Sequence, residues 1–370
     1  MRPFIFSICM LILVIQSLGQ SRKIICIPDI PGYHTLKCDF HTHTIFSDGT
    51  VWPTVRVEEA WRDGLDAISI TDHIEYRPHS KDVEADHNRS FQIAEPLAKS
   101  RNILLIKGAE ITRNMPPGHF NTLFIKNANL LDRENVFDAL REARDQGAFI
   151  IWNHPGWKAQ QPDTTLWWDD HTRLLNNNML HGIEVFNYNE YYPEAMDWAM
   201  DKKLTLFANT DTHNPIDMEY DLNAEHRPMT LVFSKSRTED GIREALFSRR
   251  TVAWYNNTLV GKAGILEPLF FASLQITASP GLLRNGETRK IELANHSDID
   301  YELELVQPGV GFDATTSVIV NANKVSVIEL SGNSDEVATM NELKVYYRVK
   351  NMMLNSRNNL VITFSIPNSQ

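Results

Sequence analysis

Short apolar runs alternate with amphipathic stretches along residues 36–235. The apolar runs are TLKCDF, LDAISI, ILLIKGA, FNTLFI, AFIIWN, GIEVFN, LTLFAN and MTLVF. Segments between them, such as TVRVEEAWRDG and ENVFDALREARDQG, repeat apolar residues at helical spacing. Continuously apolar strands separated by helices indicate βα units and a parallel sheet. About seven or eight such units in ~230 residues predict an α/β barrel.

The pattern changes after residue 268, where apolar and polar residues alternate at period two. The segments are PLFFASLQITASPG, SVIVNANKVSVIELSG and ELKVYYRVKNMML, with turn residues between them. This alternation predicts a small all-β sandwich of Ig-like type. We therefore expect a barrel domain over residues 20–265 and a β-sandwich domain over residues 268–368.

The first residues, MRPFIFSICMLILVIQSLGQS, combine an early cation, an apolar run and a small residue, Gly19. This predicts a cleaved signal peptide over residues 1–19, and hence a secreted or periplasmic protein. The alternative is a membrane anchor, but the run is shorter than the ~20 residues that a span needs. In an oxidising compartment Cys26 and Cys38 could form a disulfide, although nothing in the sequence demands it.

Charge and histidine distribution narrow the chemistry. The net charge of -11 argues against a duplex nucleic-acid partner, because phosphate binding on that scale needs a basic face. A small anion can still bind if the site carries its own cations. His296 is the only histidine beyond His226, so we expect the chemistry to belong to the barrel.

Five predicted strands each end in histidine or carboxylate. The residues at these ends are His41, His43 and Asp48; His73; Glu110; His154; and Asp211 and His213. Taken singly, each reads best as a capping or turn residue. Barrels of this class build active sites where the strands end, so the joint pattern predicts that the groups converge on one rim. Imidazoles and carboxylates gathered there need cations between them, which favours several divalent ions such as Zn, Mn or Fe.

Spacing within the motifs refines this expectation. Residues i and i+2 of a strand point to the same side, so His41 and His43 can reach one ion together. Asp72, beside His73, points the other way and is expected to orient a ligand imidazole. His119 begins an apolar run, which in a regular barrel would direct it to the wrong rim.

These motifs together resemble the PHP superfamily, named for polymerase and histidinol phosphatase domains, over about residues 36–260. The matching segments are HTH with a downstream Asp, TDH, GAEIT, GHF, NHP and DTH. The resemblance implies a distorted (β/α)7 barrel with nine ligands around three metals, and it restores His119 as a ligand. The signal, the EITRNMPPGHFN segment and the trailing β domain look most like secreted PHP phosphodiesterases of the Sb-PDE type.

The resemblance also implies which residues share each ion. One ion takes His41, His43, Glu110 and Asp211; a second shares Glu110 and adds His119 and His154; a third takes Asp48, His73 and His213. The implied reaction is hydrolysis of a small phosphoester by a hydroxide that the ions hold and activate. Glu110, Asp48, Asp211 and His213 are the expected catalytic groups.

Substrate preference follows from the rim. Arg113, Asn114 and Lys158 are candidate substrate-binding residues, Arg113 through a charge-assisted contact to a phosphoryl oxygen. Few other cations lie near the motifs, which favours a phosphodiester over a phosphomonoester of the histidinol-phosphatase type. An amidohydrolase is disfavoured by Glu110 at the bridging position and by the closing DTH motif. A non-catalytic metal-binding module is the alternative outside enzymes.

Overall fold

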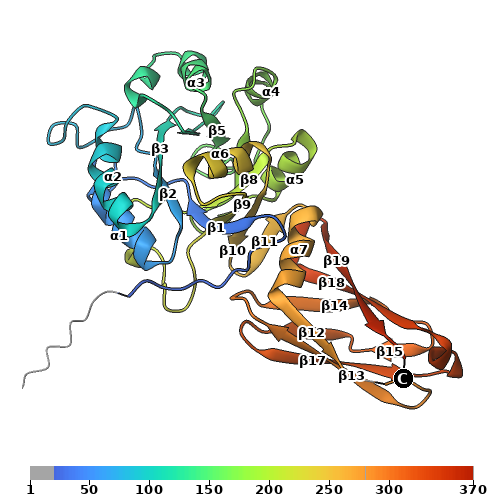
Figure 1. Cartoon of the computed structure of the whole chain (residues 1–370). Coiled ribbons are helices and arrows are strands. Elements are labelled where there is room, and N and C mark those ends of the chain that lie inside the picture. Colours follow the sequence, from blue (N-terminus) through green and yellow to red (C-terminus); the bar gives the residue numbers. More distant parts are fainter. Residues whose placement is uncertain (1–20, 280, 370) are drawn as a thin grey trace, which may run out of the picture.

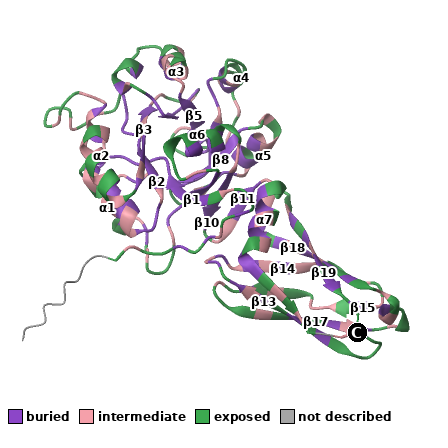
Figure 2. Cartoon of the chain, in the orientation of Figure 1, coloured by how far each residue is buried: buried purple, intermediate pink, exposed green. Residues whose placement is uncertain are grey.

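The computed structural model describes residues 21–279 and 281–369. Its N-terminal part is a barrel of strands wrapped by helices (Figure 1). The barrel strands are β1 (His34–Asp39), β2 (Ala67–Ile70), β3 (Leu104–Ile111), β4 (Phe120–Leu123), β5 (Phe149–Trp152), β6 (Gly182–Asn187), β8 (Thr205–Asn209) and β9 (Met229–Ser234). Most of their residues are buried, as Figure 2 shows, which is why the strands read as continuous apolar runs.

The strand directions make the barrel a distorted one. Strands β1, β2 and β3 are mutually parallel, as are β5, β6 and β8. Strand β4 runs antiparallel to both β3 and β5, and β9 runs antiparallel to β1. The expectation of a wholly parallel sheet is therefore wrong at β4 and β9. The reversal of β4 brings its beginning to the rim where β3 and β5 end.

The barrel closes through a side chain where β8 meets β9. Thr230 Oγ1 donates to the carbonyl oxygen of Ala208 at 2.9 Å and accepts from the Ala208 N–H at 3.0 Å. A hydroxyl that donates and accepts can join two strands that form no backbone ladder with each other. The sheet is thereby wrapped into a closed wall around the apolar interior.

Amphipathic helices cover the outside of this wall. The α-helices are α1 (Pro53–Arg62), α2 (Arg89–Arg101), α3 (Val136–Asp145), α4 (Asp169–Asn176), α5 (Pro193–Lys202) and α6 (Glu239–Phe247). The barrel part also has two short 3-10 helices, η1 (Ala128–Leu131) and η2 (Ile216–Met218), and a third, η3 (Asp335–Thr339), lies in the C-terminal part. Helix α3 begins where the Asn135 side chain accepts from the Phe137 N–H, and α6 begins where Thr238 accepts from the Gly241 N–H. These polar residues before apolar stripes are the sequence signals for the helix starts.

The C-terminal part is an all-β sandwich. One layer contains β14 (Tyr301–Gln307), β16 (Ser317–Val320), β18 (Glu342–Asn355) and β19 (Asn358–Pro367); the other contains β12 (Leu274–Ala278), β13 (Thr288–Asn295), β15 (Phe312–Ala314) and β17 (Val325–Gly332). Alternating buried and exposed residues along β13 and β19 match the period-two pattern. The predicted architecture, a distorted barrel followed by a β sandwich, is confirmed.

The junction between the two parts is continuous. Strands β10 (Thr251–Tyr255) and β11 (Thr258–Gly261) extend the barrel sheet, and β11 pairs in parallel with β18. Helix α7 (Ala263–Ser273) follows and packs at the same junction (Figure 1). The segment PLFFAS, expected to begin the β pattern, is helical and lies within α7. A run of consecutive apolar residues does not distinguish a buried helix from a strand, and packing decided it.

Two further expectations concern the N-terminal region and the cysteines. The predicted signal peptide lies outside the described residues. Across residues 21–279 and 281–369, none of the helices has the length and apolar character that crossing a bilayer requires. Cys26 is exposed and Cys38 is buried in β1, and both are free thiols, so the disulfide considered from the sequence is not formed.

Candidate metal centre

All nine sequence-predicted ligands gather at one end of the barrel. The residues are His41, His43, Asp48, His73, Glu110, His119, His154, Asp211 and His213. The inclusion of His119 depends on the reversal of β4, which pairs Phe120 with Ile111 of β3. His119 Nδ1 consequently lies 3.1 Å from Glu110 Oε1. The wrong-rim expectation for His119 is corrected, because it assumed a parallel strand.

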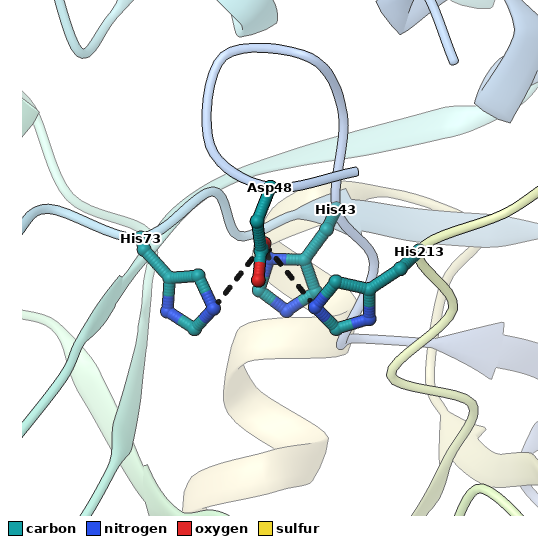
Figure 3. A group of neighbouring side chains, drawn as sticks. All are labelled: His43, Asp48, His73 and His213. Carbon is teal, nitrogen blue, oxygen red and sulfur yellow. Dashed lines mark ion pairs between the residues drawn. The ribbon is translucent and has the colours of Figure 1, made fainter. Parts of the chain in front are cut away.

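The first ligand group surrounds Asp48, which the loop after β1 carries across the rim. Figure 3 shows Asp48 between His73 and His213, with His43 beside them. Asp48 Oδ1 lies 3.4 Å from His73 Nε2, 3.2 Å from His213 Nε2 and 3.9 Å from His43 Nδ1. One potential ligand atom from each of these four residues lies within 4.8 Å of all the others.

The second group joins His41 and His43, which follow β1, to Asp211, which follows β8. Asp211 Oδ1 lies 3.1 Å from His41 Nε2 and 3.0 Å from His43 Nε2. Glu110 Oε2 approaches the same two nitrogen atoms, at 3.6 and 3.5 Å. The His-x-His spacing thus directs both rings to one point, as the alternation of a strand predicts.

The third group is built around Glu110, which faces both sides of the cluster. His73 Nδ1 lies 2.8 Å from Glu110 Oε2, while His119 approaches Oε1. His154 Nε2 is 3.7 Å from Glu110 Oε1 and 3.9 Å from Asp211 Oδ2. Glu110 therefore lies between the groups and can serve more than one of them.

The donor set fits divalent cations. His41 Nε2, His43 Nε2, Asp48 Oδ1 and Glu110 Oε2 are buried and form no hydrogen bond. A buried polar atom without a partner costs about 1–3 kcal/mol, so four in one place would be strongly unfavourable. Neutral imidazole nitrogen and carboxylate oxygen are the ligands that zinc, manganese and iron accept. Cations shared among these atoms would satisfy all of them.

The pKa values of the clustered histidines and carboxyl groups are strongly shifted by burial and by their neighbours. Burial opposes the charged form of His73, but Glu110 and Asp48 outweigh it and raise the pKa of His73 to about 10. Burial likewise opposes charge on His213, and Asp48 and Asp211 raise its pKa to about 9. Burial and the neighbouring His213 and His73 lower the pKa of His43 to about 3. The neighbouring imidazoles hold the pKa values of Asp48, Glu110 and Asp211 below the ordinary carboxyl range, against the effect of burial. The three carboxyl groups thus stay ionised and are suited to binding cations.

A buried carboxylate that the sequence analysis missed supports the ligands from behind. Glu184 of β6 accepts from His41 Nδ1 at 2.8 Å and from the His154 N–H at 2.7 Å. Asn209 and Asn187 donate to the same carboxylate, at 2.9 and 2.8 Å. Holding the proton on His41 Nδ1 leaves Nε2 free to bind a metal. The sequence signal that could have identified Glu184 is its position as a single charged residue inside the apolar run GIEVFN.

The turn that carries Asp48 is fixed by a second buried carboxylate. Asp72 accepts from the Thr44 N–H at 2.7 Å and from Ser47 Oγ at 2.9 Å, and Ser47 Oγ lies 3.3 Å from His43 Nδ1. Asp72 therefore reaches a ligand imidazole through Ser47. A Cβ at Gly49 would lie 2.7 Å from the His43 carbonyl carbon, so the turn can fold this closely only on glycine.

A buried arginine ties the two ligand-bearing loops together. Arg56 of α1 donates through Nε to the His43 carbonyl at 2.8 Å and through Nη2 to the Thr212 carbonyl at 3.1 Å. Nη1 donates to the Asn214 carbonyl at 2.8 Å and pairs with Glu59. Each of the two loops contributes ligands to the first and second groups. Arg56 thus holds their spacing without touching the ligand atoms.

The three candidate substrate-binding residues lie away from the cavity above the cluster. Arg113 pairs with Glu75 and donates to the carbonyls of Thr112 and Arg133. Its guanidinium is therefore occupied within the protein, which argues against the contact to a phosphoryl oxygen. Lys158 lies beside a separate surface hollow, and Asn114 accepts the Gly118 N–H through its backbone.

A cavity of about 580 Å³ opens over the ligands. Its wall includes three aromatic side chains, Tyr76, Trp157 and Tyr188, and the acidic residues Glu190 and Glu219. Among the described residues, neither lysine nor arginine lines it. Any cationic partner for an anion bound here must come from metal or imidazole.

Comparisons with known proteins agree with this architecture and site. Residues 274–365 match a family model described as an Ig-like domain. The chain is similar to a solved two-domain protein of Bacteroides vulgatus that contains a predicted PHP-like metal-dependent phosphoesterase. The two are 44% identical, with 94% of this chain and 100% of that chain covered and a TM-score of 0.89. An uncharacterised protein of Methanocaldococcus jannaschii is 29% identical over 195 residues, which cover 50% of this chain and 84% of that protein.

Proposed function

The chain belongs to the PHP superfamily of metal-dependent phosphoesterases, and from this premise we propose that it is a secreted hydrolase of small phosphodiesters with a trinuclear metal centre. The observation that carries the proposal is the set of four buried ligand atoms without hydrogen-bond partners. They face one another across a single cluster that opens to a cavity. A relic barrel that bound nothing would have no reason to keep this arrangement.

Three ions are proposed to share the nine ligands as the family resemblance implies. Asp48, His73 and His213 would hold one ion, in agreement with their approach to one another. His41, His43, Glu110 and Asp211 would hold another, and Glu110 with His119 and His154 a third. Divalent ions, when bound, lower the pKa of a coordinated water toward ~7 and neutralise charge on phosphoryl oxygens.

The protein's own residues hold this site in place and keep it ionised. Asp48, Glu110 and Asp211 remain carboxylates, because the surrounding imidazoles lower their pKa values. Glu184 fixes the tautomer of His41, and Arg56 holds the two ligand loops at their distance. We propose that Glu110, Asp48, Asp211 and His213 are the catalytic groups. Asp48, Asp211 and His213 line the cavity, and Glu110 lies buried between the ligand groups.

The cavity wall favours a diester as substrate. A dianionic monoester gains from charge-assisted contacts to arginine or lysine, and neither lines the cavity in the described part of the chain. A diester carries a single negative charge and needs room for a second substituent. The aromatic wall offers such room next to the cluster.

Metal analysis combined with two chromogenic esters tests the proposal. The purified protein is expected to retain two or more divalent ions per chain and to hydrolyse bis(p-nitrophenyl) phosphate faster than p-nitrophenyl phosphate. A strong preference for the monoester would overturn the diester assignment in favour of a phosphomonoesterase. Inertness toward both esters at full metal loading would overturn the enzymatic proposal. Mass analysis of the exported chain tests secretion, with a new N-terminus expected near Gly19–Gln20.

A further inference from the structure

The turn that forms one side of the cavity is supported from two directions. Strand β7 (Glu190–Tyr191) pairs antiparallel with β6, so residues Asn187–Glu190 form a tight β6–β7 turn. Tyr188 occupies a left-handed conformation at φ 53° and projects into the cavity wall with Glu190. On its inner side the turn meets the site, since Asn187 donates to Glu184 and lies 3.4 Å from Asp211 Oδ2.

On its outer side the same region meets the Ig-like domain. The Asp197 carboxylate of α5 accepts from the Ser356 N–H at 2.9 Å and from Ser356 Oγ at 2.6 Å. Ser356 lies in the turn between β18 and β19, so this contact joins the two domains. Helix α5 begins at Pro193, directly after β7, so a displacement of α5 also displaces the β6–β7 turn.

A second contact reaches β7 itself. Tyr191 Oη lies 3.9 Å from Met353 Sδ of β18 and 3.3 Å from Met196 Sδ of α5. Met353 also packs against the barrel core cluster that contains Phe186 and Tyr255. The backbone pairing of Val260 with Met353 fixes the position of the Met353 side chain along the barrel strand β11. The Ig-like domain therefore contacts this region twice: Met353 packs against Tyr191 of β7, and Ser356 donates hydrogen bonds to Asp197 of α5.

We propose that the Ig-like domain is a positioning element for catalysis: through Ser356 and Met353 it sets the β6–β7 turn and so shapes the substrate side of the cavity. This inference rests on the proposed function, because it assumes that substrate contacts Tyr188 and Glu190. It assigns the domain a role in substrate binding and none in metal binding, because neither Ser356 nor Met353 belongs to the nine ligands and their contacts are with Asp197 and Tyr191.

The test uses point variants in the full chain. Ser356→Ala removes one of the two hydrogen bonds to Asp197, and Met353→Ala removes the contact beneath β7. We expect either change to raise KM for bis(p-nitrophenyl) phosphate by about threefold or more, within the range of long-range coupling energies, while kcat stays within about twofold. Ser356→Thr keeps the hydroxyl and should restore KM. Ser326→Ala, an exposed hydroxyl on β17 that donates to Ile319, is the matched control and should leave both constants unchanged.

Hydrogen exchange and metal content separate this role from a merely structural one. In Ser356→Ala, exchange should accelerate in residues 187–193, while the metal content and the exchange of the β1 and β8 loops stay as in the unchanged protein. Unaltered KM and unaltered exchange in both variants would overturn the inference and leave the phosphodiesterase proposal standing. Absence of diester hydrolysis by the unchanged, metal-loaded protein would overturn the proposed function, and the inference with it.

Discussion

Glu184→Gln is the most informative single change at this site, because it alters one atom of a group that touches no metal ligand atom. The four hydrogen bonds that Glu184 accepts come from His41 Nδ1, the His154 N–H, Asn209 and Asn187. Glutamine has one oxygen, so its amide nitrogen must face two of these donors in either orientation. One orientation would force His41 to carry its proton on Nε2, the atom that faces the cluster.

The magnitude follows from the two hydrogen bonds that are lost. Loss of a partner behind a metal-binding histidine typically costs about tenfold to a hundredfold in metal affinity, which corresponds to about 1.4–2.7 kcal/mol. We expect Glu184→Gln to show a loss in this range, together with a lower unfolding temperature of the metal-free protein. Activity at saturating metal should recover in large part, since all nine ligands remain.

Metal affinity is measured by competition with a chromogenic chelator, and stability by thermal unfolding after chelation. Glu58→Gln is the matched control, because Glu58 is a half-exposed glutamate of α1 that pairs with Arg101 away from the cluster. The reasoning fails if Glu184→Gln binds metal as tightly as the Glu58→Gln control.

Three further changes probe the ligands, the cavity wall and the pH dependence. Glu110→Gln should reduce the metal content by two ions and lower diester turnover by more than about a hundredfold, measured by elemental analysis and initial rates, because Glu110 lies between two ligand groups. Trp157→Ala should raise KM for bis(p-nitrophenyl) phosphate by up to about tenfold through loss of aromatic contact, whereas Phe247→Ala, an equally exposed aromatic at the other end of the barrel, should not. Burial lowers the pKa values of His171 and His226 to about 4. Both pKa values lie below the value of ~6.5 for a histidine in the unfolded chain, so the contribution of each neutral side chain to stability is fully present above pH ~6.5. As the pH falls from ~6.5 through 4, about 3 kcal/mol of the free energy of unfolding is lost for each histidine. Unfolding by denaturant between pH 7 and 4 measures this loss.

The outcomes that would contradict these predictions are distinct. Near-normal turnover of Glu110→Gln would refute the ligand assignment. Equal KM values for the Trp157 and Phe247 variants would remove the aromatic wall from substrate binding. His226→Asn keeps the donor to the Arg227 carbonyl but cannot titrate, so an unchanged acid dependence in that variant would show that burial of this histidine is not the cause.

Most element types and the nine clustered ligands could be predicted from the amino-acid sequence, apart from helix α7, part of which was expected to be a strand. The apolar runs and helical stripes predicted the barrel, and the period-two pattern predicted the sandwich. Both patterns are local, because the residues of an element that face the core must be apolar. The HTH and DTH motifs reached the cluster for the same reason, since a strand places alternate residues on one side wherever it is packed. The PHP resemblance then supplied His119, which local reasoning had set aside.

Tertiary structure alone decided the features that depend on the direction and partners of an element. The reversal of β4 placed His119 at the rim, and periodicity carries no record of strand direction. Glu184 was found by its four donors, three of which come from segments far apart from it in the chain. The contacts of the Arg113 guanidinium with Glu75 and two backbone carbonyls likewise became visible only in the folded chain. The contact of Ser356 with Asp197 joins two domains, so no local pattern could predict it. Side chains that contact each other come from segments distant in sequence, so their pairing becomes known only once the whole chain is folded.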